Sequence, residues 1–133
     1  MRKSGILMPV ASLPGPYGIG SLGKPAFAFI DFLKKAGQKV WQMLPLSPTG
    51  FGDSPYQSCS AFAGNPYFID LDILRKKGLL KKGEYGAKEC CTNEGAVDYA
   101  ALYHSRYGVL RKAFARFSTW YPDDYYRFCY EQG

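Results

Sequence analysis

The first 44 residues constrain the fold most strongly, because short apolar runs alternate there with glycine- and proline-rich breaks. Residues 5–10 (GILMPV) form an apolar run, and the proline- and glycine-rich residues 12–23 that follow cannot be helical. Pro25 and Gly37 then bracket a segment whose apolar residues fall at helical spacing. Residues 39–44 are rich in β-forming residues and end at a proline. This order predicts a right-handed β-α-β unit with two parallel strands.

The rest of the chain is predicted to be helical after one long loop. We expect Asp72 to cap a short helix ended by Gly78, Asp98 to cap a longer one, and a last helix over residues 125–131. The longer helix has an apolar stripe of Tyr99, Leu102, Tyr103, Arg106, Tyr107, Leu110, Phe114 and Phe117. Two parallel strands alone make a poor sheet, so we expect the chain to be part of a larger parent.

Several aromatic side chains are expected to be structural. Trp41 and Phe68 lie beside predicted strands, and Tyr107, Phe114 and Phe117 lie on the helical stripe. Aromatic residues at such positions usually belong to a core. We therefore assign these five to the interior.

Composition limits the classes of protein to consider. The 133 residues, 47% of them apolar, are enough for one core. No apolar run approaches the roughly 20 residues of a membrane span, and residues 6–10 are too short for a signal peptide. We expect no membrane association and a cytoplasmic location.

Metal, cofactor and nucleic-acid sites are not indicated. The four cysteines form no CxxC pair, and His104 is the only histidine, so we expect reduced thiols and no metal. The sequence has no phosphate-binding loop, and no cofactor is expected. The 17 basic residues exceed the 11 acidic ones, but they fall on predicted helix surfaces rather than in a known nucleic-acid-binding module.

Residues 44–71 (LPLSPTGFGDSPYQSCSAFAGNPYFIDL) carry the strongest functional signal. This long loop combines flat aromatic rings, which stack on sugar rings, with side chains that hydrogen-bond to hydroxyls. Long loops in compact domains are usually functional, although an ordered loop packed on itself is the alternative. Because parallel strands end at the same edge, we expect Tyr17 of the first loop and Tyr56 of this loop to share a cleft.

Three motifs give the chain a resemblance to a known family. They are SLPGPYGIGSLG at residues 12–23, the segment KVWQMLPLSPTGFGDSPYQSCSAFAGNPYFIDL at residues 39–71, and VDYAALY at residues 97–103. In this order and spacing the chain closely resembles the N-terminal quarter of the amylomaltases, which are 4-alpha-glucanotransferases. The resemblance implies an α/β fold, the first two strands of a (β/α)8 barrel of the alpha-amylase-like clan. Residues 1–70 would form the two βα units, and residues 71–133 a truncated helical inserted subdomain.

The resemblance also implies the chemistry. Such enzymes transfer segments of alpha-1,4-glucan between maltooligosaccharides with retention, which requires a carboxylate nucleophile about 5 Å from a carboxylic acid and a glycosyl-enzyme intermediate. The family's catalytic carboxylates lie on later barrel strands, so no catalytic residue is assigned here. We expect the isolated chain to be inactive and to supply glucan-binding loops.

The site residues implied by the resemblance are all substrate-binding. They are Tyr56, Asp53, Ser54, Gln57, Phe51 and Tyr103. Tyr56 matches the tyrosine that stacks on the sugar beside the scissile bond. Phe51 and Tyr103 match aromatics that hold glucan away from the catalytic centre, although several members have tyrosine where this chain has Phe51.

Two alternatives remain open from the sequence. The chain could be a stand-alone, non-catalytic glucan-binding or self-associating module, or a truncated product without independent function. In either case the exposed strand edges need a cover, supplied by the remainder of the barrel or by self-association.

Overall fold

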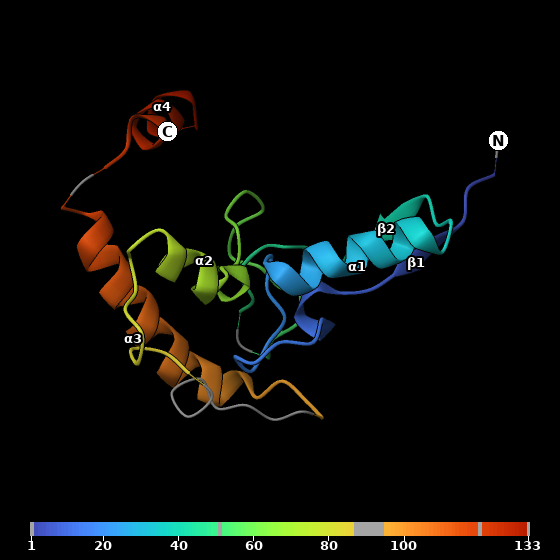
Figure 1. Cartoon of the computed structure of the whole chain (residues 1–133), viewed down its shortest axis with the longest axis horizontal. Helices are drawn as coiled ribbons and strands as arrows, with labels where there is room; N and C mark the ends of the chain where they lie inside the picture. Colours follow the sequence, from blue (N-terminus) through green and yellow to red (C-terminus); the bar gives the residue numbers. More distant parts are fainter. Residues whose placement is uncertain (1, 51, 87–94, 120, 133) are drawn as a thin grey trace.

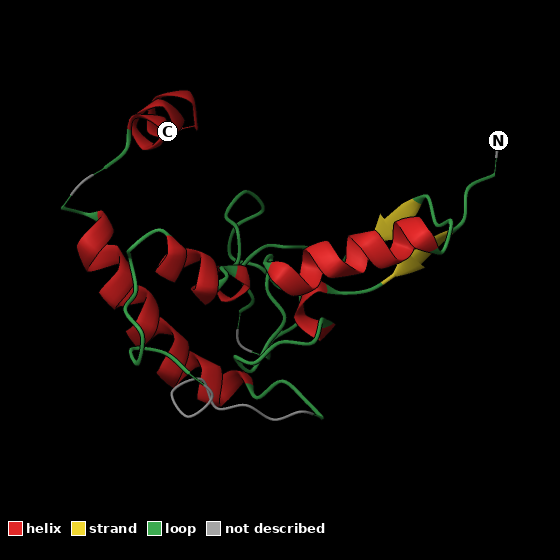
Figure 2. Cartoon of the chain, viewed as in Figure 1, coloured by secondary structure: helices red, strands yellow, loops and turns green. Residues whose placement is uncertain are grey.

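The computed structural model describes residues 2–50, 52–86, 95–119 and 121–132 of the chain (Figure 1). Its elements are β1 (Gly5–Leu7), the 3₁₀ turn η1 (Val10–Ser12), α1 (Lys24–Lys35), β2 (Val40–Gln42), η2 (Pro66–Phe68), α2 (Leu71–Lys76), α3 (Tyr99–Phe117) and α4 (Asp123–Gln132). The strands and α1 lie at one end of the molecule, while α3 runs along the other side and α4 stands apart (Figure 2).

The predicted β-α-β unit is confirmed. β1 pairs with β2 in parallel, with Ile6 opposite Trp41, and α1 connects the two strands. Both strands are shorter than predicted, at three residues each. The first ends before Pro9, which has no N–H to donate, and the chain turns into η1. Gly5 is required in this pairing, because a Cβ there would lie 2.6 Å from the carbonyl oxygen of Val40.

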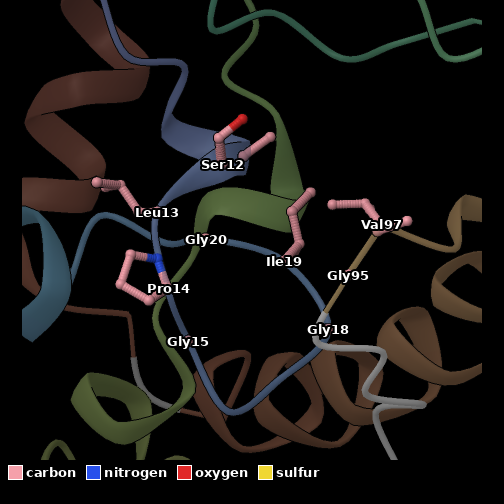
Figure 3. Close-up of a pocket in the computed structure, with 11 residues that line it drawn as sticks. Ser12, Leu13, Pro14, Gly15, Gly18, Ile19, Gly20, Gly95 and Val97 are labelled. Carbon is pink, nitrogen blue, oxygen red and sulfur yellow. The ribbon is translucent and has the colours of Figure 1, made fainter.

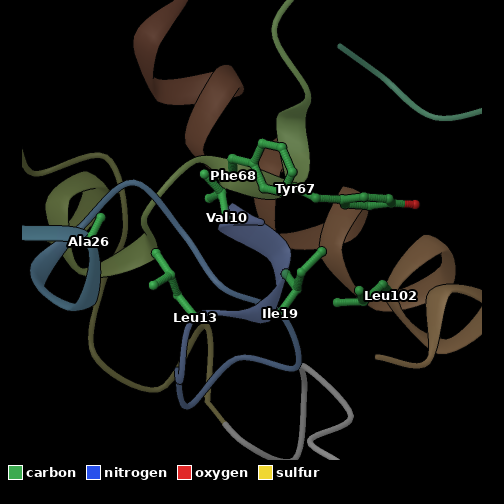
Figure 4. Packing of buried hydrophobic residues seen from close by; sticks show 7 residues of the cluster. All are labelled: Val10, Leu13, Ile19, Ala26, Tyr67, Phe68 and Leu102. Carbon is green, nitrogen blue, oxygen red and sulfur yellow. The ribbon is translucent and has the colours of Figure 1, made fainter. Parts of the chain in front are cut away.

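Two apolar clusters hold the chain together. The N-terminal core comprises Val10, Leu13, Ile19, Ala26, Tyr67, Phe68 and Leu102 (Figure 4). The helical core comprises Leu71, Leu80, Tyr85, Val109 and Ala113. The N-terminal core joins the first loop, the end of the long loop and the start of α3. The helical core joins α2 and the segment after it to the middle of α3.

The cap of α2 differs from the prediction. Asp70, not Asp72, is the N-cap, and its side chain accepts from the backbone N–H of Ile73 at 2.9 Å. Asp72 lies in the first turn, where its carboxylate accepts from the hydroxyls of Tyr17 and Tyr85. The Asp72 carboxylate, which the sequence predicted to be the cap, therefore binds these two distant hydroxyls instead.

The predicted start of α3 is confirmed, but its buried face is rotated from the predicted stripe. Asp98 caps the helix by accepting from the N–H of Ala101 at 2.9 Å. The buried residues of α3 are Leu102, Arg106, Val109 and Ala113. The assignment of Phe114 to the core was wrong, because its side chain is 59% exposed. The last helix begins at Asp123, two residues before the predicted start.

In the part of the chain that the structure describes, no helix combines the length and apolar character needed to cross a membrane.

Candidate functional site

An open pocket of about 650 Å³ lies between the long loop and one face of α3. The loop contributes Asp53, Asn65 and Tyr67 to its lining. The helix contributes Tyr99, Tyr103, His104 and Tyr107. Aromatic rings beside a carboxylate and an amide provide both stacking surfaces and hydrogen-bonding groups for a sugar. We call this the tyrosine pocket.

Its aromatic wall is a set of four tyrosines in edge or tilted contact. The ring centroid of Tyr67 lies 6.3 Å from that of Tyr99 and 5.6 Å from that of Tyr107. The ring of Tyr103 lies 5.5 Å from that of Tyr107. Tyr67 is buried, whereas Tyr103 is 62% exposed. The wall therefore has a fixed base at Tyr67 and a ring at Tyr103 that is open to a ligand.

The hydroxyls of Tyr67 and Tyr99 keep their protons at neutral pH. Burial, followed by the neighbouring Tyr107 and the carboxylate of Asp53, raises the pKa of Tyr67 to about 12. Burial and Asp53 also raise the pKa of Tyr99. Both phenols can therefore donate a hydrogen bond to a sugar oxygen as well as accept one.

Asp53 is held by a strained turn in the loop. It is a non-glycine residue in the left-handed region, with φ of 57°, and it follows Gly52 with φ of 94°. Its N–H donates to the carbonyl of Gly50 at 3.1 Å, and the N–H of Gly50 donates to the carbonyl of Gln57 at 2.9 Å. Residues in this conformation cost about 1–3 kcal/mol and cluster at functional sites. The turn keeps the Asp53 carboxylate on the pocket side of the loop.

The closing end of the loop is fixed to its beginning and to α3. The N–H of Asn65 donates to the carbonyl of Leu46 at 2.8 Å. The side-chain oxygen of Asn65 accepts from the N–H of Tyr67 at 2.9 Å. The guanidinium of Arg106 donates to the carbonyls of Tyr67 and Ile69. These contacts place Tyr67 against α3.

The structure brings together two of the six predicted binding residues, Asp53 and Tyr103. Tyr56 is 74% exposed and lies outside the lining of this pocket. The Ser54 hydroxyl accepts from the N–H of Tyr56 at 3.3 Å, which shapes the same turn. The side chain of Gln57 is exposed, and Phe51 lies outside the described residues.

The sequence reasoning missed Tyr99 and Tyr107 as pocket residues. Together with Tyr103 they recur every four residues, which places all three on one side of α3. That spacing was the available signal, but it was interpreted as part of a core stripe.

In the described part of the chain, the Tyr17 side chain lies against α2 and the helical core rather than in the predicted cleft with Tyr56. The hydroxyl of Tyr17 donates to Asp72 at 2.9 Å, and its ring contacts that of Tyr85 at 5.4 Å. Tyr17 thus packs on the helical core. Its position follows from the hydrogen bond to α2, which the sequence pattern did not reveal.

The first loop instead borders a second cavity of about 610 Å³, shown in Figure 3. Its lining comes from Ser12, Pro14, Gly15 and Gly18 of the first loop and from Gly95 and Val97 of the segment before α3. Glycines and prolines present few side-chain groups there, so this cavity offers less specific chemistry than the tyrosine pocket.

Metal ligands do not converge among the described residues, where no three His, Cys, Asp or Glu side chains form a group able to hold an ion. Cys59 and Cys129 are exposed free thiols, and Cys90 and Cys91 lie outside the described residues.

A β-α-β unit whose second strand leads into a pocket of tyrosines, an amide and a carboxylate makes this chain an α/β protein with a pocket beyond the carboxyl end of a strand. Comparison with known proteins makes this specific. The sequence model of the 4-alpha-glucanotransferase family matches residues 8–133, and the chain belongs to that family.

Individual relatives support the same family assignment. A 4-alpha-glucanotransferase from Clostridium butyricum is 55% identical over 112 residues, which are 84% of this chain and 23% of the relative. One from Thermus thermophilus is 51% identical over 116 residues, which are 87% of this chain and 22% of the relative. The chain thus spans about a quarter of the length of the curated relatives it matches.

A solved structure is also similar. An amylomaltase from Streptococcus agalactiae in complex with acarbose superposes with a TM-score of 0.80 and 43% identity. The match covers 98% of this chain and 26% of the amylomaltase. The resemblance found in the sequence is therefore confirmed.

Proposed function

We propose that this chain is the glucan-binding N-terminal part of a retaining 4-alpha-glucanotransferase, and that the tyrosine pocket binds an alpha-1,4-glucan. The observation that carries the proposal is the convergence of Asp53 with Tyr99, Tyr103 and Tyr107 in one open pocket. Family membership over residues 8–133 supports the reaction class. The amylomaltase similar to this chain binds acarbose.

The proposed architecture assigns residues 1–70 to the first two βα units of a (β/α)8 barrel. β1 and β2 are parallel and joined by α1, as adjacent barrel strands must be. Residues 71–133 would be the helical inserted subdomain. The remainder of the barrel would cover the exposed side chains of Leu7 and Val40 on the two strands.

In this role the chain binds and orients sugar rather than breaking bonds. The exposed ring of Tyr103 would stack on a pyranose face, while the Asp53 carboxylate and the phenol of Tyr99 would hydrogen-bond its hydroxyls. The double displacement itself would use carboxylates on later barrel strands. Binding glucan away from the reacting bond contributes to orientation of the donor segment.

Tyr56, Ser54 and Gln57 remain predicted contacts near the scissile bond. The exposed Tyr56 ring is open to a ligand. No cofactor or metal is proposed, and the cytoplasmic location predicted from the sequence stays a prediction.

The test is Tyr103→Ala in the complete protein, with Phe114→Ala as the matched control. Both are exposed aromatics on α3, at 62% and 59%, but only Tyr103 lines the tyrosine pocket. Truncating a stacking anchor costs about 1–3 kcal/mol, so the Kd for maltoheptaose measured by calorimetry should rise about 5- to 150-fold. The control should change it less than about twofold. An unchanged Kd for Tyr103→Ala refutes binding at this pocket.

A further inference from the structure

We infer that Arg106 is a positioning residue of the tyrosine pocket. This arginine holds the end of the long loop against α3, so that the two walls of the pocket keep their relative positions. The inference rests on the proposed function. Its basis is a single arginine that is 0% exposed and whose guanidinium donates to two backbone carbonyls of the loop.

The first step is geometric. Nη2 of Arg106 donates to the carbonyl of Tyr67 at 3.1 Å and also to the carbonyl of Ile69. The ring of Tyr67 forms the base of the pocket, against Tyr99 and Tyr107 of the same helix that carries Arg106. The arginine therefore joins the loop wall to the helix wall at Tyr67, a residue that lines the pocket.

The second step is energetic. A fully buried guanidinium carries a large desolvation penalty, which an apolar side chain of similar volume would avoid. Its neighbours on the buried face of α3, Leu102, Val109 and Ala113, are all apolar. What an apolar residue cannot supply is the charged Nη2 donor group, which contacts both loop carbonyls and determines where they lie. The arginine therefore fixes the position of the loop carbonyls, which an apolar side chain could not do.

The third step links position to binding. Tyr67 reaches the pocket through a backbone fixed on one side by Asn65, whose side chain accepts from the N–H of Tyr67, and on the other by Arg106. Releasing the second contact allows the Tyr67 ring to move away from Tyr107. A pocket whose walls are not held in place loses affinity, because ligand binding must then also order the loop.

The chain supplies a matched control in Arg116. It lies on the same helix and also donates to a backbone carbonyl, that of Leu79 at 2.8 Å. However, it holds the segment around Glu84 and lines no part of the tyrosine pocket. Arg106→Met and Arg116→Met thus each remove an arginine that holds a backbone carbonyl to α3, but only the first affects a residue that lines the pocket.

The experiment measures maltoheptaose Kd and amide hydrogen exchange of residues 65–70 in the complete protein, well below the melting temperature of each variant. We expect Arg106→Met to raise Kd about tenfold and Arg106→Lys, which keeps a charged donor group without the guanidinium geometry, to give an intermediate value. Arg116→Met should stay within about twofold of the unsubstituted protein. Exchange of residues 65–70 should accelerate in the two Arg106 variants only.

The inference is overturned if Arg106→Met leaves Kd unchanged. It is also overturned if Arg116→Met raises Kd as much as Arg106→Met does. If Arg106→Met does not fold, Arg106→Lys decides, and an unchanged Kd there also overturns the inference. Tyr103→Ala separates the two proposals: if it weakens binding while the Arg106 variants do not, only the positioning role fails. If Tyr103→Ala binds normally, the pocket itself is wrongly assigned and both fail.

Discussion

Gly23 lies so close to Asp70 that a single added methyl group tests how the first loop is joined to α2. A Cβ at Gly23 would lie 1.8 Å from Oδ2 and 2.2 Å from Cγ of Asp70. The φ of Gly23 is −123°, which any residue can adopt, so the penalty of Gly23→Ala comes from this contact. The carboxylate cannot move without loss, since Oδ1 caps α2 at Ile73 and Oδ2 accepts from the Ser21 hydroxyl at 2.8 Å.

The cost follows from the two interactions that the carboxylate would give up. Losing an N-cap costs about 1 kcal/mol, and losing a hydrogen bond to a charged group costs about 1.5–3 kcal/mol. Gly23→Ala should therefore lower the free energy of unfolding by about 2.5–4 kcal/mol, measured from urea midpoints by circular dichroism. The control is Gly64→Ala, because a Cβ there has no heavy atom within 4 Å and should change the free energy by less than about 0.5 kcal/mol.

A double-mutant cycle with Asp70→Ala sharpens the test. That substitution removes the two closest contacts and leaves Cβ of residue 70 at 2.8 Å from the added methyl group. Gly23→Ala should therefore cost much less in the Asp70→Ala background. Additive effects, or a Gly23→Ala protein as stable as the Gly64→Ala control, would refute the reasoning that a pinned carboxylate blocks the methyl group.

Three further predictions concern the core, an ion pair and activity. Leu102 is fully buried in the N-terminal core, so Leu102→Ala should lower the free energy of unfolding by about 2–5 kcal/mol, against less than about 1 kcal/mol for the exposed Leu22→Ala. The guanidinium of Arg116, with the N–H of Lys81, lowers the pKa of Glu84 from 4.5 to about 2, so the stabilisation is present above pH 4.5 and is lost as pH falls toward 2. Glu84→Gln should flatten that part of the melting-temperature profile, and an equally steep profile would exclude the ion pair as the cause. The isolated chain should form no glucose or longer oligomers from maltotriose in product chromatography, and their appearance would show that the catalytic carboxylates reside within it.

Local signals in the sequence predicted the local structure well. Pro25 and Gly37 bracket α1, and Asp98 caps α3, because each of these effects depends on residues within one turn of the helix. Whether Asp70 or Asp72 caps α2 does not depend on neighbouring residues alone. Both precede apolar residues, and the hydroxyls of Tyr17 and Tyr85 decide it from 55 and 13 positions away.

The same distinction explains how much of the tyrosine pocket was visible in advance. The resemblance predicted Asp53 and Tyr103 as site residues. The four-residue spacing of the α3 tyrosines is visible in the sequence, but it was interpreted as part of a core. Arg106 was placed on the apolar stripe with no role. Its partners are the carbonyls of Tyr67 and Ile69, and every residue has a carbonyl. Such a contact requires an arginine at position 106 but no particular side chain at the loop positions that it holds. Only the three-dimensional path of the loop therefore reveals the contact.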